Sequence, residues 1–130
     1  MKSASFLRSR ARSFRYAFEG WRYVMRTQHN AWIHATATVC VLVLAFTLKL
    51  PGRDWAVLIL TIALVWTAEL INTAIEAVVD LASPHFDQLA KVAKDVAASA
   101  VLVTAVAAVV VGLLILGPPL WQLSLLWLQK

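Results

Sequence analysis

A row of carboxylate and amide side chains interrupts one of the most apolar parts of the chain. The segment AELINTAIEAVVD, residues 68–80, carries Glu69, Asn72, Glu76 and Asp80. Each residue of an α-helix turns the side-chain direction by ~100°, so these four side chains point within about 80° of one another. Two carboxylates on one helix face can divide a reaction between them, because one can accept a proton while the other holds a divalent cation.

The depth of Glu69 in the expected membrane helix is hard to explain by structure alone. A helix that starts at an outer boundary near Trp55 rises ~1.5 Å per residue, which puts Glu69 roughly 20 Å into a hydrocarbon core of ~30 Å. A charged side chain there costs on the order of 2.5–3.5 kcal/mol, whereas an interhelical hydrogen bond returns ~0.6 kcal/mol on average. We therefore expect a functional site at Glu69, and expect Asp80, Asp87 and Lys91 to be solvated.

Polar groups from three apolar segments gather at the same expected membrane boundary. Lys94 and Asp95 precede the third apolar run, and the first run begins with Gln28, His29, Asn30 and His34. Because a lysine can neutralise phosphate oxygens, this set indicates transfer of a phosphoryl group to a lipid alcohol. The alternative is a small non-enzymatic membrane subunit for binding or transport, although transport predicts polar residues at mid-depth. For His34 itself, the sequence favours a hydrogen bond to a neighbouring helix.

The elements that must position these residues are membrane helices. The chain is 61% hydrophobic and 15% charged, which excludes an ordinary soluble domain. Three runs, at about 31–50, 55–81 and 96–117, are long enough to span a bilayer. Proline-containing clusters at 49–54, 83–87 and 117–119 separate or end these runs. We expect a single all-α membrane domain over 1–130, with residues 118–130 as an outer tail that could form a short surface helix.

The residues before the first run predict an additional helix, over 1–28, in the membrane surface. Phe14, Phe18, Trp21 and Met25 share one helical stripe, and arginines occupy a neighbouring arc. Such a helix can anchor the protein, or it can also wall an active site, in which case Trp21 contacts the lipid. The sequence leaves both roles open.

The basic residues predict the orientation of the chain. Seven precede the first run, out of 12 in the whole chain: Lys2, Arg8, Arg10, Arg12, Arg15, Arg22 and Arg26. This excess places the N-terminus in the cytoplasm and the chain in the cytoplasmic membrane, as a multi-pass protein. No nucleic-acid-reading motif accompanies the basic cluster, so nucleic acid is not an expected partner, and no GxxxxGK[ST] loop is present.

Small residues recur at every fourth position of the third run, at Ala100, Thr104, Ala108 and Gly112. Small side chains at this spacing let membrane helices approach closely. The stripe predicts a helix–helix contact within or between subunits, and an oligomeric protein.

Two segments carry a resemblance to a known family. Residues 68–81, AELINTAIEAVVDL, and residues 90–101, AKVAKDVAASAV, resemble motifs of the prokaryotic diacylglycerol kinases, which include the undecaprenol kinases. Residues 14–20, FRYAFEG, and 30–34, NAWIH, are also similar, and the resemblance extends over about 14–117. The order and spacing of the two main motifs make it specific.

The resemblance implies more than the spacing of residues predicts. It implies a surface helix plus three membrane helices, a homotrimer, active sites shared between neighbouring subunits, and Mg²⁺ with ATP as co-substrate. By position, Glu69 would be the general base and would contact the lipid hydroxyl. Glu76 would bind metal and nucleotide, and Asn72, Lys94 and Asp95 would bind the nucleotide.

The sequence departs from the family pattern at Gln28. Many members carry a glutamate there that helps to hold metal, and a neutral amide makes the site one negative charge poorer. Gln28 therefore stays a doubtful metal ligand. The pattern of Asn30 and His34 resembles the undecaprenol-accepting branch, but the sequence does not identify the lipid.

Overall fold

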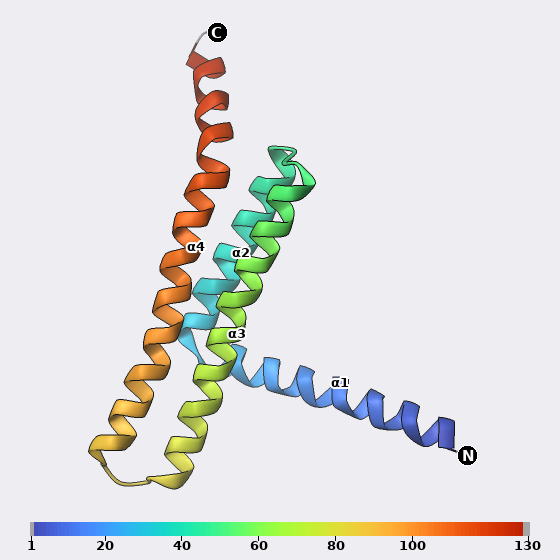
Figure 1. The fold of residues 1–130 in the computed structure, drawn as a ribbon, viewed down its shortest axis with the longest axis vertical. Helices are drawn as coiled ribbons and strands as arrows, with labels where there is room; N and C mark the ends of the chain where they lie inside the picture. Colours follow the sequence, from blue (N-terminus) through green and yellow to red (C-terminus); the bar gives the residue numbers. More distant parts are fainter. Residues whose placement is uncertain (1, 129–130) are drawn as a thin grey trace.

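The computed structural model describes residues 2–128, and within them the chain forms four α-helices (Figure 1). They are α1 (Lys2–Thr27), α2 (His29–Thr47), α3 (Gly52–Ala82) and α4 (Gln88–Leu128). The prediction of an all-α protein is confirmed for this part of the chain. The last two residues of the expected outer tail, 129–130, lie outside the described residues.

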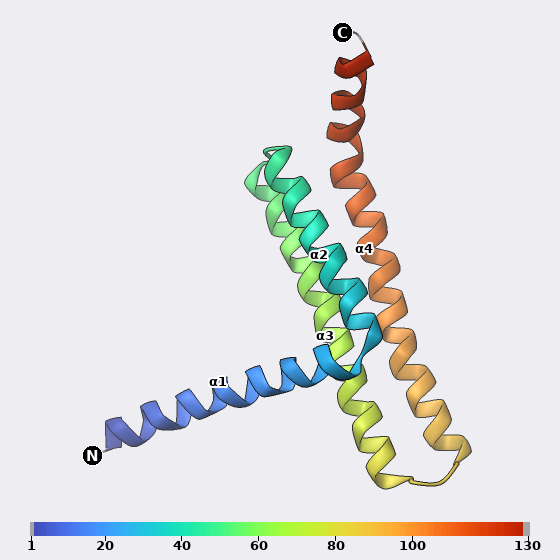
Figure 2. The ribbon, with the colours of Figure 1, turned by 180° about the vertical axis from the view of Figure 1, so that it is seen from behind.

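The helices α2, α3 and α4 run side by side, while α1 leaves them steeply to one side (Figures 1 and 2). The contact between α3 and α4 is the most extensive of the packing contacts. The beginning of α2, the end of α3 and the beginning of α4 all lie toward one end of the bundle, which is where the polar residues of the three runs were expected to meet.

Three helices, α2, α3 and α4, are long and apolar enough to cross a membrane. Most of their large apolar side chains are exposed, for example Phe46, Leu64 and Leu114. Exposure of this kind suits helices surrounded by hydrocarbon, because no polar solvent is present there to penalise it. That α1 lies in the membrane surface stays a prediction.

Two small buried clusters hold the bundle together. Near the α1–α2 junction, Val24, Ala31 and Trp66 join α1, α2 and α3. Toward the other end, Ala45, Leu58 and Leu116 join α2, α3 and α4. The first cluster lies one helical turn from Glu69, so it helps to fix the helices around that residue.

The turn between α2 and α3 ends α2 with a Schellman motif. The Leu50 N–H donates to the Ala45 carbonyl at 3.2 Å, and the Lys49 N–H donates to the Phe46 carbonyl at 3.2 Å. This motif needs a left-handed residue after the cap, and Lys49 fills that position with φ of 53°. Lysine has a steric energy penalty in this conformation, whereas glycine adopts it freely.

The structure corrects the expected start of the third span. Lys94 and Asp95 were expected to precede this helix, but α4 begins at Gln88 and includes both. The Asp87 carboxylate accepts hydrogen bonds from the Leu89 and Ala90 N–H groups, at 2.7 and 3.0 Å. Asp87 therefore caps the helix and sets its first turn, rather than being only solvated as expected.

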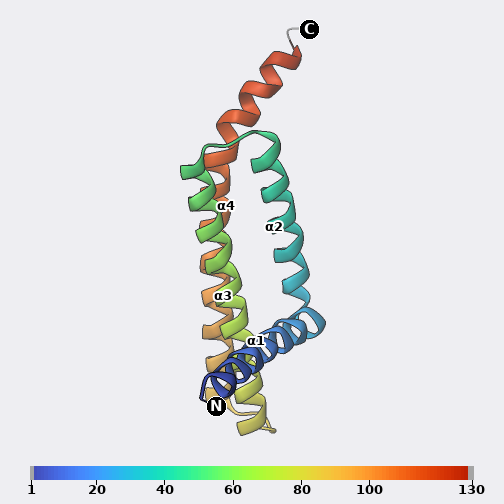
Figure 3. The same ribbon diagram turned by 90° about the vertical axis from the view of Figure 1, so that its right-hand side faces the viewer.

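The expected break at Gly117–Pro119 is also wrong, because α4 continues through Pro118 and Pro119 to Leu128. Each proline removes one N–H from the helical ladder, but membrane helices tolerate prolines where local adjustments satisfy the freed carbonyls. The C-terminal part of α4 leans away from the rest in Figure 3, as expected for a proline-induced bend. With 41 residues, α4 extends about 60 Å, well beyond a hydrocarbon core of ~30 Å.

The stripe of small residues on α4 has no close neighbour within the chain at Gly112. A methyl group added there would meet no atom within 4 Å. Ala108 and Gly112 instead line a groove described below. Among the described residues, Gly112 therefore makes no close contact with another helix of the same chain, and a contact between subunits stays a prediction.

Candidate active site

The polar stripe of α3 is largely buried. Glu69 is 1% exposed, Thr73 4% and Asn72 7%, whereas Glu76 is half-buried and Asp80 exposed. The Thr73 hydroxyl donates to the Glu69 backbone carbonyl at 2.9 Å, so it is satisfied within the helix. The stripe therefore runs from a deeply buried carboxylate to one at the surface.

Two amides hold the Glu76 carboxylate. The Asn72 Nδ2 donates to Glu76 Oε1 at 3.0 Å, and the Gln28 Nε2 donates to Glu76 Oε2 at 2.9 Å. Gln28 is the N-cap residue of α2, at the junction with α1. The structure thus brings Gln28 to Glu76, with the amide nitrogen toward the carboxylate.

Glu69 has a different environment from Glu76. Both of its carboxylate oxygens are buried without a hydrogen-bond partner among the described residues. His34 is close, with Nε2 3.9 Å from Glu69 Oε2, but this distance is too long for a hydrogen bond. The hydrogen bond expected for His34 from the sequence is thus not formed at Nε2, which also has no partner.

Trp66 connects the site to α1 and α2. Its ring lies 4.5 Å from that of Trp21, its Nε1 donates to the Thr38 hydroxyl at 3.2 Å, and its ring meets the His34 ring edge-on at 6.2 Å. Trp66 was not among the residues predicted for the site. Its position three residues before Glu69 on the same helix face was the signal that could have identified it.

Lys94 and Asp95 form ion pairs with residues other than Glu69 and Glu76. Lys94 forms an ion pair with Asp80 of α3, and Asp95 accepts a hydrogen bond from Lys91 one turn earlier on α4. Lys94 is therefore next to the surface end of the stripe, and the structure does not bring these two side chains to Glu69 or Glu76 within one chain.

The residues around Glu76 can contribute ligands to one divalent cation. The Asn72 Oδ1 is buried without a hydrogen-bond partner, next to the Glu76 carboxylate, and both are the hard oxygen ligands that Mg²⁺ prefers. Among the described residues no cluster of three or more His, Cys, Asp or Glu side chains is present. The Glu76 carboxylate and the Asn72 Oδ1 thus offer two oxygen ligands of the kind that suits Mg²⁺.

An apolar groove leads along the membrane-spanning part of the bundle to His34. It has a volume of about 450 Å³ and lies between α2, α3 and α4. Its walls include His34 and Thr38 on α2, Val65 on α3, and Ala108 and Gly112 on α4. The lining of the groove is largely apolar, and His34, one of its lining residues, lies 3.9 Å from Glu69.

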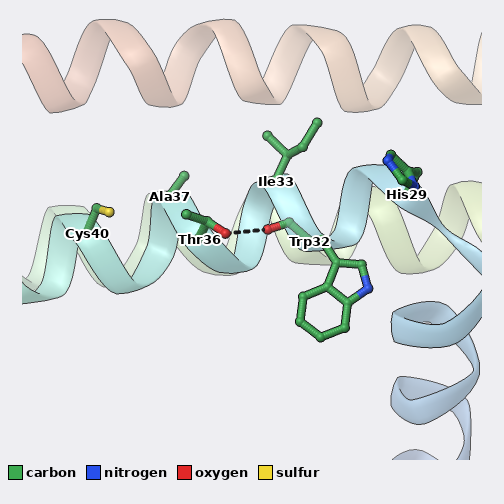
Figure 4. Close-up of a pocket in the computed structure, with 6 residues that line it drawn as sticks. All are labelled: His29, Trp32, Ile33, Thr36, Ala37 and Cys40. Atoms are coloured by element: carbon green, nitrogen blue, oxygen red, sulfur yellow. Dashed lines mark hydrogen bonds between the residues drawn. The ribbon is translucent and has the colours of Figure 1, made fainter.

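A second depression, on α2, contains none of the predicted site residues (Figure 4). It is lined by His29, Trp32, Ile33, Thr36, Ala37 and Cys40. In Figure 4 the Ile33 side chain points toward the neighbouring helix and the Trp32 ring points away from it. The Thr36 hydroxyl donates to the Trp32 carbonyl at 2.9 Å, so it is already satisfied and offers little for a polar ligand.

Comparisons with known proteins agree on one family. Residues 15–116 match the family of prokaryotic diacylglycerol kinases. A diacylglycerol kinase of Synechocystis sp. is 50% identical over 112 residues, which are 85% of this chain and 64% of that protein. An undecaprenol kinase of Bacillus subtilis is 42% identical over 109 residues, which are 84% and 89% of the two chains. A diacylglycerol kinase of Escherichia coli is 30% identical over 95 residues, 73% and 78% of the two chains.

Proposed function

Because this chain belongs to the prokaryotic diacylglycerol kinase family, a family of lipid kinases, we propose that it transfers the γ-phosphoryl group of ATP to the hydroxyl group of a membrane lipid alcohol. The observation that carries this proposal is Glu69, a buried carboxylate without a hydrogen-bond partner, next to a residue that lines an apolar groove. A hydroxyl group at the end of a hydrocarbon chain in the groove would reach such a carboxylate from the hydrocarbon side.

Glu69 acts as the general base of the reaction. Its carboxylate accepts the proton of the lipid hydroxyl while the hydroxyl oxygen forms a bond to the γ-phosphorus and the bond to the ADP oxygen breaks. General bases contribute roughly 10²–10⁴ to rates of this kind. The lack of competing hydrogen bonds leaves the Glu69 oxygens available to the substrate.

Glu76, Asn72, Lys94 and Asp95 serve the nucleotide. Glu76 and Asn72 would hold Mg²⁺, which when bound supplies charge neutralisation on the phosphates. For Gln28 to add a ligand, its amide must rotate, because its nitrogen now faces Glu76. Lys94 neutralises phosphate oxygens, and Trp21 on α1, which packs against Trp66 and is partly exposed, contacts the lipid.

The active site lies at the cytoplasmic face of the cell membrane, and the protein is a homotrimer. The seven basic residues before α2 support the first statement, because such an excess marks the cytoplasmic side. The ion pairs of Lys94 and Asp95 support the second statement. Within one chain Lys94 pairs with Asp80 and Asp95 pairs with Lys91, and we expect both side chains to serve the site of a neighbouring subunit.

The acceptor belongs either to the diacylglycerols or to the polyprenols, the two classes in the names of the relatives. The test is ADP release by the purified protein in mixed micelles with diacylglycerol, undecaprenol, or neither. We expect ADP release that depends on one acceptor and yields its phosphate ester. ADP release without an acceptor, or ATP binding without turnover under all conditions, would favour the non-enzymatic alternative.

A further inference from the structure

Between α2 and α3, His34 Nε2 and both carboxylate oxygens of Glu69 lie close together without a hydrogen-bond partner among the described residues. The Glu69 side chain is 1% exposed and that of His34 14%, so water has little access to either. Their closest atoms, His34 Nε2 and Glu69 Oε2, are 3.9 Å apart, and neither has a hydrogen-bond partner among the described residues. A hydrogen bond needs roughly 2.7–3.2 Å, so a movement of about 1 Å would form one.

The imidazole ring of His34 is held at this place by aromatic packing. Trp66 meets it edge-on, with ring centroids 6.2 Å apart and planes at 70°. Trp66 is itself fixed by its hydrogen bond to Thr38 and by its stack on Trp21. Both contacts hold the ring beside α3, so only a small adjustment separates Nε2 from the carboxylate.

An unpaired carboxylate in this environment is strongly disfavoured. Leaving one buried partner of an ion or hydrogen-bonded pair alone is far more unfavourable than removing both. Of the titratable groups that act on Glu69, Glu76 carries the same charge as Glu69, so His34 is the one that can stabilise it. The short distance to Nε2 and the charges of the neighbouring groups thus both assign His34 as the partner of Glu69.

We propose that His34 is the positioning residue of Glu69, with its Nε2–H donating a hydrogen bond to one carboxylate oxygen and leaving the other for the lipid hydroxyl. This inference rests on the proposed function, in which Glu69 is the general base. His34 keeps its proton throughout the reaction: the hydroxyl proton goes to Glu69, and the phosphoryl group goes to the lipid oxygen.

The first test separates a hydrogen-bond donor from a space-filling side chain. His34→Gln keeps an N–H group at a similar reach, whereas His34→Leu fills the space without a donor. With saturating acceptor and ATP, we expect His34→Leu to lower kcat by about 10- to 100-fold, because a misplaced Glu69 loses part of the rate gain that a general base provides. The KM for ATP should be unchanged. His34→Gln should recover most of kcat. His85→Gln, in the exposed loop after α3, is the matched control and should equal the wild type.

The second test does not use activity. His34→Leu should lower the melting temperature of the detergent-solubilised protein by several degrees, because Glu69 loses its partner. In a Glu69→Leu background the same substitution should have no such effect, because no carboxylate remains to be paired. Equal shifts in the two backgrounds, or equal kcat for His34→Gln and His34→Leu, would overturn the proposal.

The two tests also distinguish this inference from the proposed function. If the wild type shows no lipid-dependent turnover, the proposed function fails, and the melting experiment still decides whether the pair exists. If the wild type is active but the His34 variants behave like it, the inference alone fails.

Discussion

At the scale of single residues, the site separates two carboxylates by their surroundings. The Glu69 carboxylate is buried without a hydrogen-bond partner among the described residues, and the Glu76 carboxylate is held by two amides at 2.9 and 3.0 Å. A carboxylate without competing donors is available to accept a proton, while one held in place is suited to orient a cation. Both residues are glutamates, so the different roles expected for them rest on their different surroundings and not on the type of side chain.

Replacement of Glu69 by glutamine tests its role as the base. Glu69→Gln keeps the shape of the side chain but cannot accept the proton, so turnover should fall by about 10²–10⁴. ATP affinity, measured by equilibrium binding, should change little. Glu19→Gln, an exposed carboxylate paired with Arg15 on α1, is the control and should retain wild-type turnover. A parallel loss of ATP binding would make Glu69 a binding residue instead.

Gln28 decides how much negative charge the site carries. In Gln28→Glu the donor to Glu76 is lost and two carboxylates face each other, which is favourable only when a cation lies between them. We expect the variant to reach half-maximal activity at a lower Mg²⁺ concentration, and to melt at a lower temperature than the wild type in EDTA. Its melting temperature should rise more on addition of Mg²⁺.

The control for this variant is Gln122→Glu, which adds the same charge on an exposed residue near the far end of α4.

In Glu76→Gln, activity should be nearly abolished, and the combination with Gln28→Glu should restore part of it if both side chains serve one ion. A Mg²⁺ titration of Gln28→Glu that overlays the wild type would remove position 28 from the metal site.

At the scale of the elements, the ends of the helices are set by individual residues. Asp87 caps α4, so the helix begins at Gln88 and includes Lys94 and Asp95. At the other end of the bundle, the left-handed Lys49 ends α2 and lets the chain return as α3. These local devices place the polar ends of α2, α3 and α4 at one boundary.

The strain at Lys49 gives a prediction about stability. Lys49→Gly should stabilise the protein by about 1 kcal/mol, because glycine adopts a positive φ without the steric penalty of a side chain. Thermal unfolding in detergent measures the effect. Lys49→Ala removes the same charge but keeps the penalty, so it should give no gain. Equal stabilisation by both variants would assign the effect to the charge.

At the scale of the whole molecule, one chain does not assemble all the residues expected in the site. Glu69, Asn72, Glu76 and Gln28 come together, whereas Lys94 pairs with Asp80 and Asp95 with Lys91. This pairing fits a chain that completes its site in an oligomer, as in the proposed homotrimer.

Mixing of inactive subunits tests whether the site is shared. Glu69→Gln and Lys94→Met chains are each expected to be inactive, but co-expressed they should recover up to about a quarter of wild-type activity, since random assembly then creates some intact sites. Glu69→Gln mixed with Glu76→Gln should recover none, because both residues come from the same helix. Activity in neither mixture would place Lys94 in the site of its own chain or outside the site.

The sequence by itself determined the helical architecture and the polar face of α3. The lengths of the apolar runs predicted α2 and α3 to within a few residues, and the spacing of Glu69, Asn72 and Glu76 predicted one polar face, because both depend only on the regular geometry of a helix. The motifs likewise identified the family.

Contacts between helices were decided only by the tertiary structure. The approach of His34 to Glu69, the packing of Trp21 on Trp66 and the hydrogen bond from Gln28 to Glu76 each join residues that are 35 to 48 positions apart and on different helices. The continuity of α4 through its prolines was also mispredicted, because local propensity favours a break that the helix avoids by bending. Helix periodicity fixes which side chains share a face, but which faces meet, and which atoms then pair, depends on how the helices pack.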